Sequence, residues 1–263
     1  MQAIFLVFLF VLGACVGSFL CCQARRLRLK EKGEKPLGQR SVCPKCRYQL
    51  KWYDNLPIIS WFILKGRCRK CRKKIGLAEI TSEILMALSF VAIGTTISPE
   101  LPMPLVWIIF ILSLVFVSSL GFLAIYDGLY GELPSLCLTF SIICAIIIVI
   151  LREWTSFSGW QNLGLHLGDL GLSIAVLGGL YFILYKVPRG KWVGDGDWIL
   201  GLAIAIALGH PWLCLIVLFI SNLLACLVML PFIKKTKKIH FGPFLVAAYI
   251  ITATFANFFL SVI

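Results

Sequence analysis

Long runs of apolar residues, separated by short polar or basic segments, dominate this chain. A helix needs about 20 predominantly apolar residues to cross the hydrocarbon core of a bilayer. The runs that reach or approach this length are 2–22, 79–97, 104–126, 133–151, 166–186, 198–209, 211–231 and 242–262. The pattern therefore predicts an all-α polytopic membrane protein with about eight transmembrane helices.

The sixth run, 198–209, is short for a complete crossing, and Pro211 separates it from the seventh because proline interrupts a helix. Seven spans is therefore the alternative count. Lysine and arginine favour cytoplasmic loops. With eight spans and the N-terminus outside, every Lys and Arg except Arg152 falls in a cytoplasmic loop or, for Lys186, at the cytoplasmic end of a span. Seven spans would move the lysine run at 234–238 to the outside, so the charge pattern favours eight.

Composition and charge agree with a membrane protein. Of the 263 residues, 60% are hydrophobic and 14% charged, whereas soluble domains average about 45–50% and about 25%. The net charge of +13 makes nucleic acid a candidate partner. However, 17 of the 25 basic residues lie between Arg25 and Lys74, next to an apolar run. This placement favours anionic lipid head groups over nucleic acid.

Four of the 11 cysteines form two Cys-x2-Cys pairs in the first basic loop: Cys43 with Cys46, and Cys68 with Cys71. Two such pairs in one cytoplasmic loop predict a tetrahedral zinc site, with four unpaired structural thiols as the alternative. The reducing compartment disfavours disulfides. Because all four ligands come from the protein, we expect the zinc to be structural. A loop of this size has too little core to fold alone, so a metal would stabilise it.

Two aspartates stand at the ends of apolar runs. Asp127 follows more than 20 mostly apolar residues, and Asp197 closes the sequence Gly194-Asp195-Gly196-Asp197 before the sixth run. The predicted topology places both at the cytoplasmic membrane boundary, although 70 residues separate them in sequence. Two neighbouring carboxylates share a proton, so one can activate water while the other protonates a leaving amine. We expect the glycines at 194 and 196 to leave room for a peptide backbone beside Asp197.

Five motifs in order resemble the type IV prepilin peptidases, which belong to the GxGD class of intramembrane aspartyl proteases. The resemblance runs along nearly the whole chain. It rests on Gly17-Ser18-Phe19-Leu20, on the four-cysteine loop with Trp52-Tyr53-Asp54-Asn55-Leu56-Pro57-Ile58-Ile59-Ser60-Trp61 between its pairs, on Asp127 followed by Pro134, on Gly194-x-Gly196-Asp197, and on Phe241-Gly242-Pro243-Phe244.

The resemblance implies a function and a location. It implies an aspartic endopeptidase of the bacterial inner membrane that cuts basic leaders from type IV prepilins or pseudopilins on the cytoplasmic side. It also implies N-methylation of the new N-terminus with S-adenosylmethionine. By the motifs, Asp127 and Asp197 are the catalytic pair, in preference to Asp195, and the four loop cysteines hold zinc. The domains would be the first transmembrane helix (1–22), the zinc module (23–78) and the membrane-embedded protease (79–263).

The chain departs from the family pattern at several positions. Cys21, Ser135 and Ile199 replace the usual polar or basic residues, and Ile80-Thr81-Ser82-Glu83 replaces Pro-Leu-Val-Glu, so only Glu83 is a plausible equivalent there. None of these departures removes a predicted catalytic carboxylate. They bear on the methyltransferase activity more than on the protease. No glycine-rich nucleotide fingerprint appears in the basic loop, so the sequence does not locate an S-adenosylmethionine site.

The positions of the two aspartates also predict how they share charge. Asp127 ends a helix and Asp197 begins one, and a helix N-terminus favours a negative charge whereas a C-terminus disfavours it. We therefore expect Asp197 to be ionised more often than Asp127.

Two other classes of function are open at this point. One is a non-catalytic membrane scaffold that docks partners through its zinc module. The other is a proton-coupled transporter that uses the two aspartates as a relay, since intramembrane carboxylates often serve in this way.

Overall fold

The computed structural model describes residues 2–33, 41–43, 45–97, 103–156, 160–187, 194–229 and 240–262. Over these ranges the chain is helical, with two isolated β-bridges as its only extended pairings. The prediction of an all-α protein is confirmed. The chain divides into two compact units, Met1–Val91 and Ala92–Ile263.

The first unit contains two long helices and a small module between them. The long helices are α1 (Gln2–Glu31) and α3 (Leu77–Thr95). The module holds a short 3-10 turn, η1 (Trp52–Asp54), and one helix of five residues, α2 (Ile59–Ile63). Helix α1 continues nine residues beyond the predicted span, through the first arginines.

Glycines on α1 allow it to approach α3 closely. A Cβ on Gly13 would lie 2.6 Å from the Met86 carbonyl oxygen, and one on Gly17 would lie 2.5 Å from the Ser82 carbonyl oxygen. Both distances are shorter than any real Cβ contact, so only glycine fits at either position. Pairs of small residues four apart in apolar helices commonly serve such contacts. This packing explains why a glycine occupies position 17, in the motif Gly17-Ser18-Phe19-Leu20.

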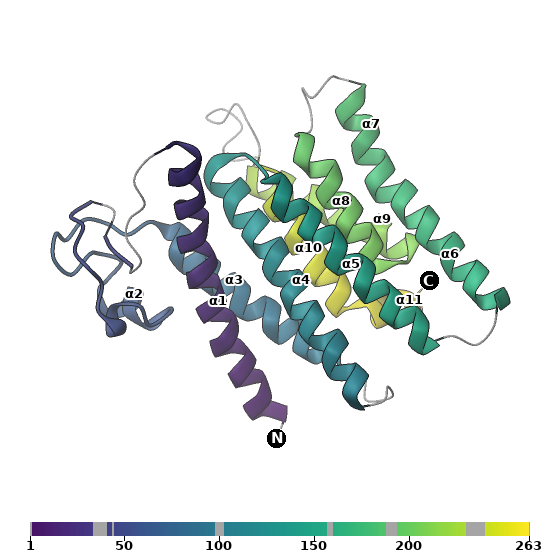
Figure 1. The fold of residues 1–263 in the computed structure, drawn as a ribbon, viewed down its shortest axis with the longest axis horizontal. Coiled ribbons are helices and arrows are strands. Elements are labelled where there is room, and N and C mark those ends of the chain that lie inside the picture. The colour runs from purple at the N-terminus through teal and green to yellow at the C-terminus, as the bar shows by residue number, and fades with distance from the viewer. Residues whose placement is uncertain are drawn as a thin grey trace. The chain divides into compact units, whose positions relative to one another are not determined.

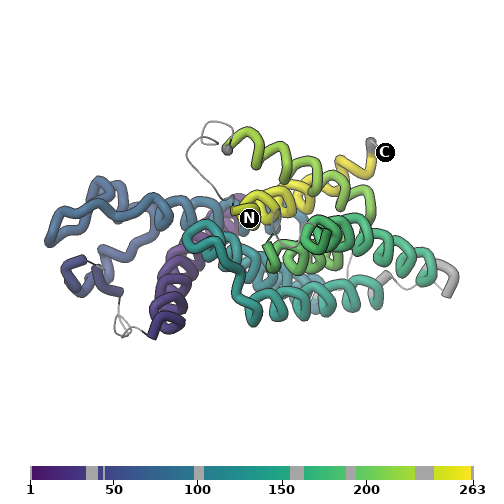
Figure 2. The backbone as a smooth tube through the Cα atoms, turned by 90° about the horizontal axis from the view of Figure 1, so that it is seen from above, coloured from purple at the N-terminus to yellow at the C-terminus, as the bar shows by residue number. Residues whose placement is uncertain are grey.

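The second unit is a helical bundle. Its helices are α4 (Met103–Tyr130), α5 (Ser135–Ser156), α6 (Trp160–Ser173), α7 (Leu180–Lys186), α8 (Asp195–Leu208), α9 (Pro211–Met229), α10 (Gly242–Thr254) and α11 (Ala256–Val262). A π-helical segment, η2 (Ile174–Gly179), joins α6 to α7. Helices α9 and α10 lie side by side, as the light green and yellow tubes in Figure 2 show.

Helix α8 forms the core of this bundle (Figure 1). It contacts α5, η2, α7, α9 and α10. Its residues Leu200, Ala203 and Ile204 have no solvent-accessible surface. A helix that is apolar on all sides is stable only when other helices or lipid surround it. The prediction that the sixth run is short is consistent with this structure, because α8 has 14 residues and is enclosed by its neighbours.

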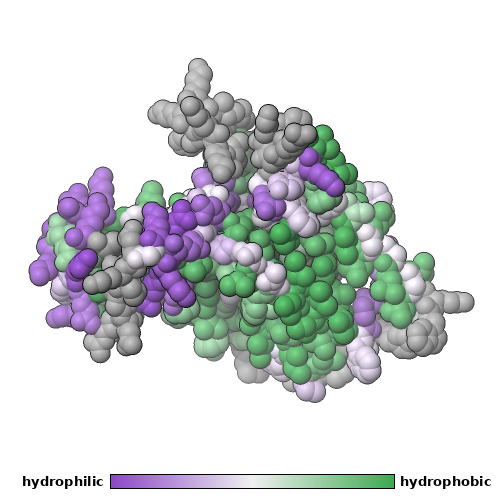
Figure 3. Space-filling model, turned by 45° about the horizontal axis from the view of Figure 1, so that its top comes forward, coloured by the Kyte–Doolittle hydropathy of each residue, from purple (hydrophilic) through white to green (hydrophobic). Residues whose placement is uncertain are grey.

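The described helices support a multi-pass membrane protein. Among them, six are long and apolar enough to cross a bilayer, and the apolar α10 is shorter. Figure 3 shows the hydrophobic surface on the helices of the second unit and the hydrophilic surface over the cysteine module. Most of each predicted run is helical in its described part; the fifth run includes the π-helical η2, and the eighth is divided at Phe255 into α10 and α11. The lysine run at 234–238 and the basic residues 189 and 191 lie outside the described residues.

We expect Gly17→Ala to destabilise the first unit by about 1–3 kcal/mol, because the new methyl group would meet the α3 backbone. The matched control is Gly164→Ala on α6, where a Cβ would have no neighbour within 4 Å. Thermal unfolding of the two purified variants in detergent measures the difference. Equal midpoints for the two variants would contradict the close α1–α3 contact.

Candidate functional site: a four-cysteine centre and two buried aspartates

The four loop cysteines come together in the first unit. Their sulfur atoms all lie within 4.8 Å of one another. The Cys43 and Cys71 sulfurs are 3.9 Å apart, and so are those of Cys46 and Cys68. Sulfur atoms about 2.3 Å from a tetrahedral zinc would be about 3.8 Å apart. The donor set and its spacing therefore fit a zinc ion held by four thiolates.

The two cysteine pairs have the same backbone structure. The Cys43 amide donates to the Tyr48 carbonyl, and the Arg47 amide donates to the Cys43 carbonyl, at 2.9 Å each. In the second pair, Cys68 donates to Lys73 at 2.9 Å, and Arg72 donates to Cys68 at 3.0 Å. The backbone directs both sulfurs of each turn toward the shared centre.

In each turn, the residue after the second cysteine has a positive φ. The values are 55° at Arg47 and 56° at Arg72. Non-glycine residues adopt this conformation only where the surroundings fix it. Together, the two turns form a matched pair of cysteine knuckles whose sulfurs could hold a metal.

The sulfurs influence one another's protonation. Although burial acts in the opposite direction, hydrogen bonds from the amides of Cys46 and Lys45 lower the pKa of Cys43 to about 7. The amide of Tyr48 acts to lower the pKa of Cys46, but burial and the neighbouring sulfurs raise it to about 11. Four adjacent thiols cannot all ionise without a cation between them. A divalent metal would supply that charge.

An ion pair between Arg69 and Asp54 links two segments of the module beside the cysteines. Arg69, inside the second knuckle, donates from Nε to the buried Asp54 carboxylate at 2.7 Å. The amide of Lys51 also donates to Asp54, at 3.2 Å. The guanidinium of Arg69 lies 5.0 Å from the centre of the Tyr53 ring. Asp54 belongs to the motif between the two cysteine pairs, in which Trp52 and Ile59 are exposed.

Replacement of Cys43 by serine should remove the metal and destabilise the first unit, because an incomplete thiolate set binds zinc weakly. Elemental analysis should find about one zinc per wild-type chain and little in Cys43→Ser. The control is Cys226→Ser, whose thiol is exposed and outside the cluster. Retention of stoichiometric metal by Cys43→Ser would refute the four-cysteine site.

Asp127 lies in the last turn of α4 and is 5% exposed. Its Oδ2 accepts a hydrogen bond from the Gly242 amide at 2.9 Å, across 115 residues of sequence. Gly242 is the first residue of α10, so the carboxylate lies at the N-terminus of that helix. The Nδ1 atom of His240 is 3.7 Å from Asp127 Oδ1, within ion-pair distance when the histidine is protonated.

Asp197 lies in the first turn of α8 and is 8% exposed. Its Oδ2 accepts a hydrogen bond from the Gly194 amide at 3.0 Å, which satisfies an otherwise unpaired amide at the helix N-terminus. Its neighbour Asp195 is exposed, and the Trp198 indole donates to it at 3.4 Å. The two aspartates of this sequence therefore have different environments.

Both buried aspartates are at the same end of the second unit. The chain leaves α4 through Gly131 and reaches Leu133, whose side chain packs against the start of α8. A Cβ on Gly196 would lie 2.5 Å from the Leu133 Cβ. The sequence-based expectation that Gly196 leaves room for a peptide is therefore wrong, because Leu133 fills that space.

Gly242 lies directly beside the Asp127 carboxylate. A Cβ there would lie 2.9 Å from Asp127 Oδ2. Gly242 belongs to the motif Phe241-Gly242-Pro243-Phe244, whose contact with Asp127 was not predicted from the sequence. No role was predicted for His240 either. The sequence around these residues does not indicate either contact, because each contact joins residues more than 100 positions apart.

We expect Gly242→Ala to displace the Asp127 carboxylate and to weaken its bond to the α10 amide. Gly128→Ala is the matched control, because a Cβ there would make an ordinary 3.7 Å contact with Pro243. If the two aspartates act together, prepilin cleavage should fall several-fold in Gly242→Ala and remain near wild type in the control. Equal rates would show that the position of Asp127 does not matter.

Sequence comparisons find similar known proteins. A model of the bacterial peptidase A24 N-terminal domain matches residues 11–97. A prepilin leader peptidase/N-methyltransferase from Myxococcus xanthus is 45% identical over 89 residues, which cover 34% of this chain and 26% of that relative. The enzyme of the same name from Aeromonas hydrophila is 29% identical over 231 residues, covering 80% of this chain and 69% of the relative.

A third relative, the prepilin leader peptidase/N-methyltransferase of Pseudomonas putida, is 24% identical over 94% of this chain and 89% of its own length. No solved structure matches the chain significantly. The class of protein is thus a multi-pass membrane protein with a four-cysteine centre that fits a metal. Within that class, the chain is similar over most of its length to proteins named prepilin leader peptidase/N-methyltransferase.

Proposed function

We propose that this protein is an aspartic endopeptidase that removes the leader peptides of type IV prepilins or pseudopilins, with Asp127 and Asp197 as its catalytic pair. The observation that carries the proposal is the burial of these two carboxylates at one end of the second unit, each hydrogen bonded to an amide at a helix N-terminus. The names of the relatives supply the substrate class.

In this proposal the two carboxylates share the proton chemistry. The ionised aspartate takes a proton from water as that water attacks the scissile carbonyl, and the protonated aspartate donates to the leaving amine. The amides of Gly194 and Gly242 orient the two side chains. Neither a metal nor a covalent intermediate is required for these steps. The four-cysteine centre serves to fold the module.

We also propose the orientation that the basic residues favour. The cysteine module and both aspartates would face the cytoplasm across the bacterial inner membrane, because the loops beside them carry the lysine and arginine clusters. A prepilin leader that is itself basic would meet the site on that side. The hydrophobic remainder of the prepilin would lie in the bilayer beside the second unit.

The proposed second activity is N-methylation of the new N-terminus. S-adenosylmethionine would supply the methyl group: the free amine forms a bond to the methyl carbon, the carbon–sulfur bond breaks, and S-adenosylhomocysteine leaves as the amine loses a proton. Relatives named as N-methyltransferases support this activity. The zinc-binding cysteines would stabilise the module and would not touch the methyl group.

Cleavage of a co-expressed prepilin tests the aspartate pair. Asp127→Asn and Asp197→Asn should each lower cleavage by at least about 10²-fold, because proton transfer by a positioned side chain contributes about 10²–10⁴-fold. Asp195→Asn is the matched control and should cleave normally, because its side chain is exposed.

Two outcomes would contradict the proposal. Full cleavage by either Asp127→Asn or Asp197→Asn would remove that residue from the catalytic pair. Absence of cleavage by the wild type, with folded protein and an intact prepilin, would favour the scaffold or transporter instead. Mass spectrometry of the mature N-terminus reports methylation separately from cleavage.

A further inference from the structure

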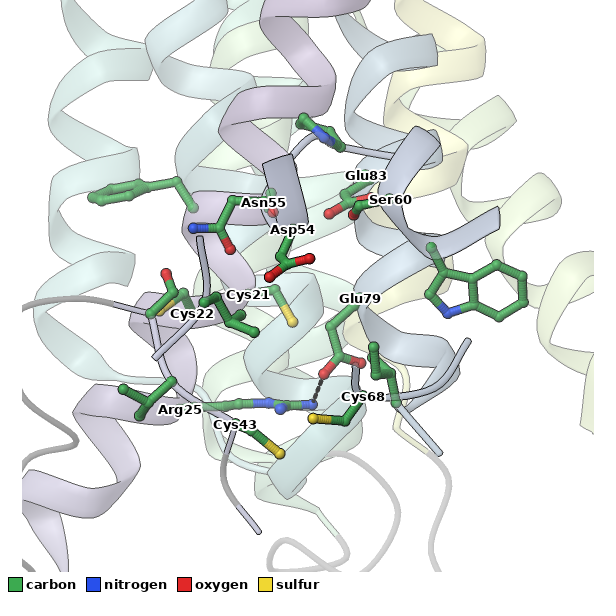
Figure 4. A pocket seen from close by; sticks show the side chains of 18 of the residues that line it. Cys21, Cys22, Arg25, Cys43, Asp54, Asn55, Ser60, Cys68, Glu79 and Glu83 are labelled. Atoms are coloured by element: carbon green, nitrogen blue, oxygen red, sulfur yellow. Dashed lines mark ion pairs between the residues drawn. The ribbon is translucent and has the colours of Figure 1, made fainter. Parts of the chain in front are cut away.

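A cavity of about 460 Å³ lies in the first unit, between the cysteine module and helices α1 and α3 (Figure 4). Small-molecule sites commonly have volumes of about 300–1,000 Å³. Helix α1 contributes Ser18 and Arg25 to the walls, α3 contributes Glu79 and Glu83, and the module contributes Trp61. The aspartate pair lies in the other unit, so the proposed protease chemistry does not account for this cavity.

The cavity contains groups of both charges. Arg25 and Glu79 form an ion pair across it (Figure 4). Asp54 is paired with Arg69. Glu83 is different: it is 7% exposed and accepts the Ile58 amide at 2.7 Å, but within the described residues it forms no ion pair. Burial of a carboxylate without a cation is unfavourable. The site therefore favours a ligand that brings a positive charge to Glu83.

Two buried polar atoms of the cavity residues lack a hydrogen-bond partner. They are the acceptor Oε2 of Glu79 and the donor Nε1 of Trp61. Buried polar groups are nearly always hydrogen bonded, so each unpaired atom needs an explanation. Both atoms are inaccessible to water, so the side chains would have to turn toward the cavity for a ligand to present a donor to Glu79 and an acceptor to Trp61. A mixed-charge ligand such as an amino acid carries both.

Trp61 is held in place by the module. Gly66 has a φ of +62°, and a Cβ there would lie 2.9 Å from the Trp61 ring. The indole thus rests against the backbone just before the second knuckle. Other walls are apolar, with Phe19, Leu50, Leu64 and Ile75. Apolar and aromatic walls with a few polar groups are typical of sites for flat, partly apolar ligands.

We infer that this cavity binds S-adenosylmethionine, an inference that rests on the proposed methyltransferase activity. The ligand's sulfonium and ammonium groups match the carboxylates of Glu83 and Glu79. Its carboxylate matches Arg25 and the Trp61 indole N–H, and its adenine matches the apolar and aromatic walls. A basic leader peptide is the competing occupant, but Arg25 in the wall opposes a purely cationic segment.

Binding of three related ligands to the purified full-length chain tests the charge match. S-adenosylmethionine carries a sulfonium, sinefungin carries an amine at the same position, and S-adenosylhomocysteine is neutral there. We expect saturable binding of one S-adenosylmethionine per chain by equilibrium dialysis or calorimetry. The two cationic ligands should bind more tightly than S-adenosylhomocysteine.

Glu83→Gln isolates the proposed charge interaction. This variant keeps an oxygen for the Ile58 amide but removes the charge. Affinity for S-adenosylmethionine and sinefungin should fall about tenfold to a hundredfold, with a smaller change for S-adenosylhomocysteine. Glu153→Gln, which alters a carboxylate of the second unit, is the control and should bind all three ligands like the wild type.

Three outcomes would overturn the inference. The first is that the folded wild type shows no saturable binding of S-adenosylmethionine. The second is that Glu83→Gln loses as much affinity for the neutral ligand as for the charged ones. The third is that a basic leader peptide binds in a Glu83-dependent way and S-adenosylmethionine does not. If Glu83→Gln does not fold, ultraviolet cross-linking of radiolabelled S-adenosylmethionine to the wild type decides. Label on peptides from residues 15–26 or 50–83 supports the site, and label elsewhere refutes it.

Prepilin cleavage by the same preparation separates this inference from the proposed function. A chain that cleaves prepilin but does not bind S-adenosylmethionine would refute the cavity assignment and leave the protease standing. A chain that binds S-adenosylmethionine with the expected dependence on Glu83 but cleaves nothing would refute the protease and leave the cavity assignment standing.

Discussion

The amide groups at the start of a helix have no partner inside that helix, and in an apolar bundle they have little access to water. In the second unit, aspartates meet this requirement at two helices. Asp197 accepts the Gly194 amide at the beginning of α8, and Asp127 accepts the Gly242 amide at the beginning of α10. These two bonds fix both proposed catalytic carboxylates on rigid helices. The bond to Gly242 also ties the end of α4 to a helix more than 100 residues later.

This arrangement changes the expected sharing of charge between the aspartates. From sequence, Asp127 ends its own helix, so its negative charge is disfavoured relative to that of Asp197. In the structure Asp127 also lies at the N-terminus of α10, which favours the charge, and His240 is 3.7 Å away. Both residues therefore lie at a helix N-terminus, and their positions no longer predict that Asp197 is ionised more often than Asp127.

Features with a local signal were predictable from the sequence. The apolar runs gave the helices, and the spacing of the cysteines gave the cluster around Cys43, because both depend on residues near one another in the chain. The burial and placement of Asp127 and Asp197 follow from the ends of such runs. The contact at Gly196 was not predictable, because the Leu133 side chain that fills the space beside it comes from the connection between α4 and α5.

The same reason explains why the cavity in the first unit was not foreseen. Its walls come from residues between positions 15 and 83 in α1, α3 and the module, and no contiguous motif joins them. The cysteines connect this cavity to the four-cysteine cluster, since Cys43 and Cys68 belong to both. A metal that fixes the knuckles would also fix one wall of the cavity. With the metal and the ligand that we propose, folding of the module and binding of the ligand would be linked.

The length of α8 bears on where the proposed proteolysis would take place. At 1.5 Å per residue, its 14 residues extend about 21 Å, which is less than the ~30 Å thickness of the hydrocarbon core. Lipid cannot satisfy the polar groups at the ends of so short a helix, so neighbouring protein has to cover them. The side chain of Asp197 and the packing of Leu133 against Gly196 do this at its first turn. A carboxylate enclosed in this way can act on a peptide bond at the membrane boundary without exposure to lipid.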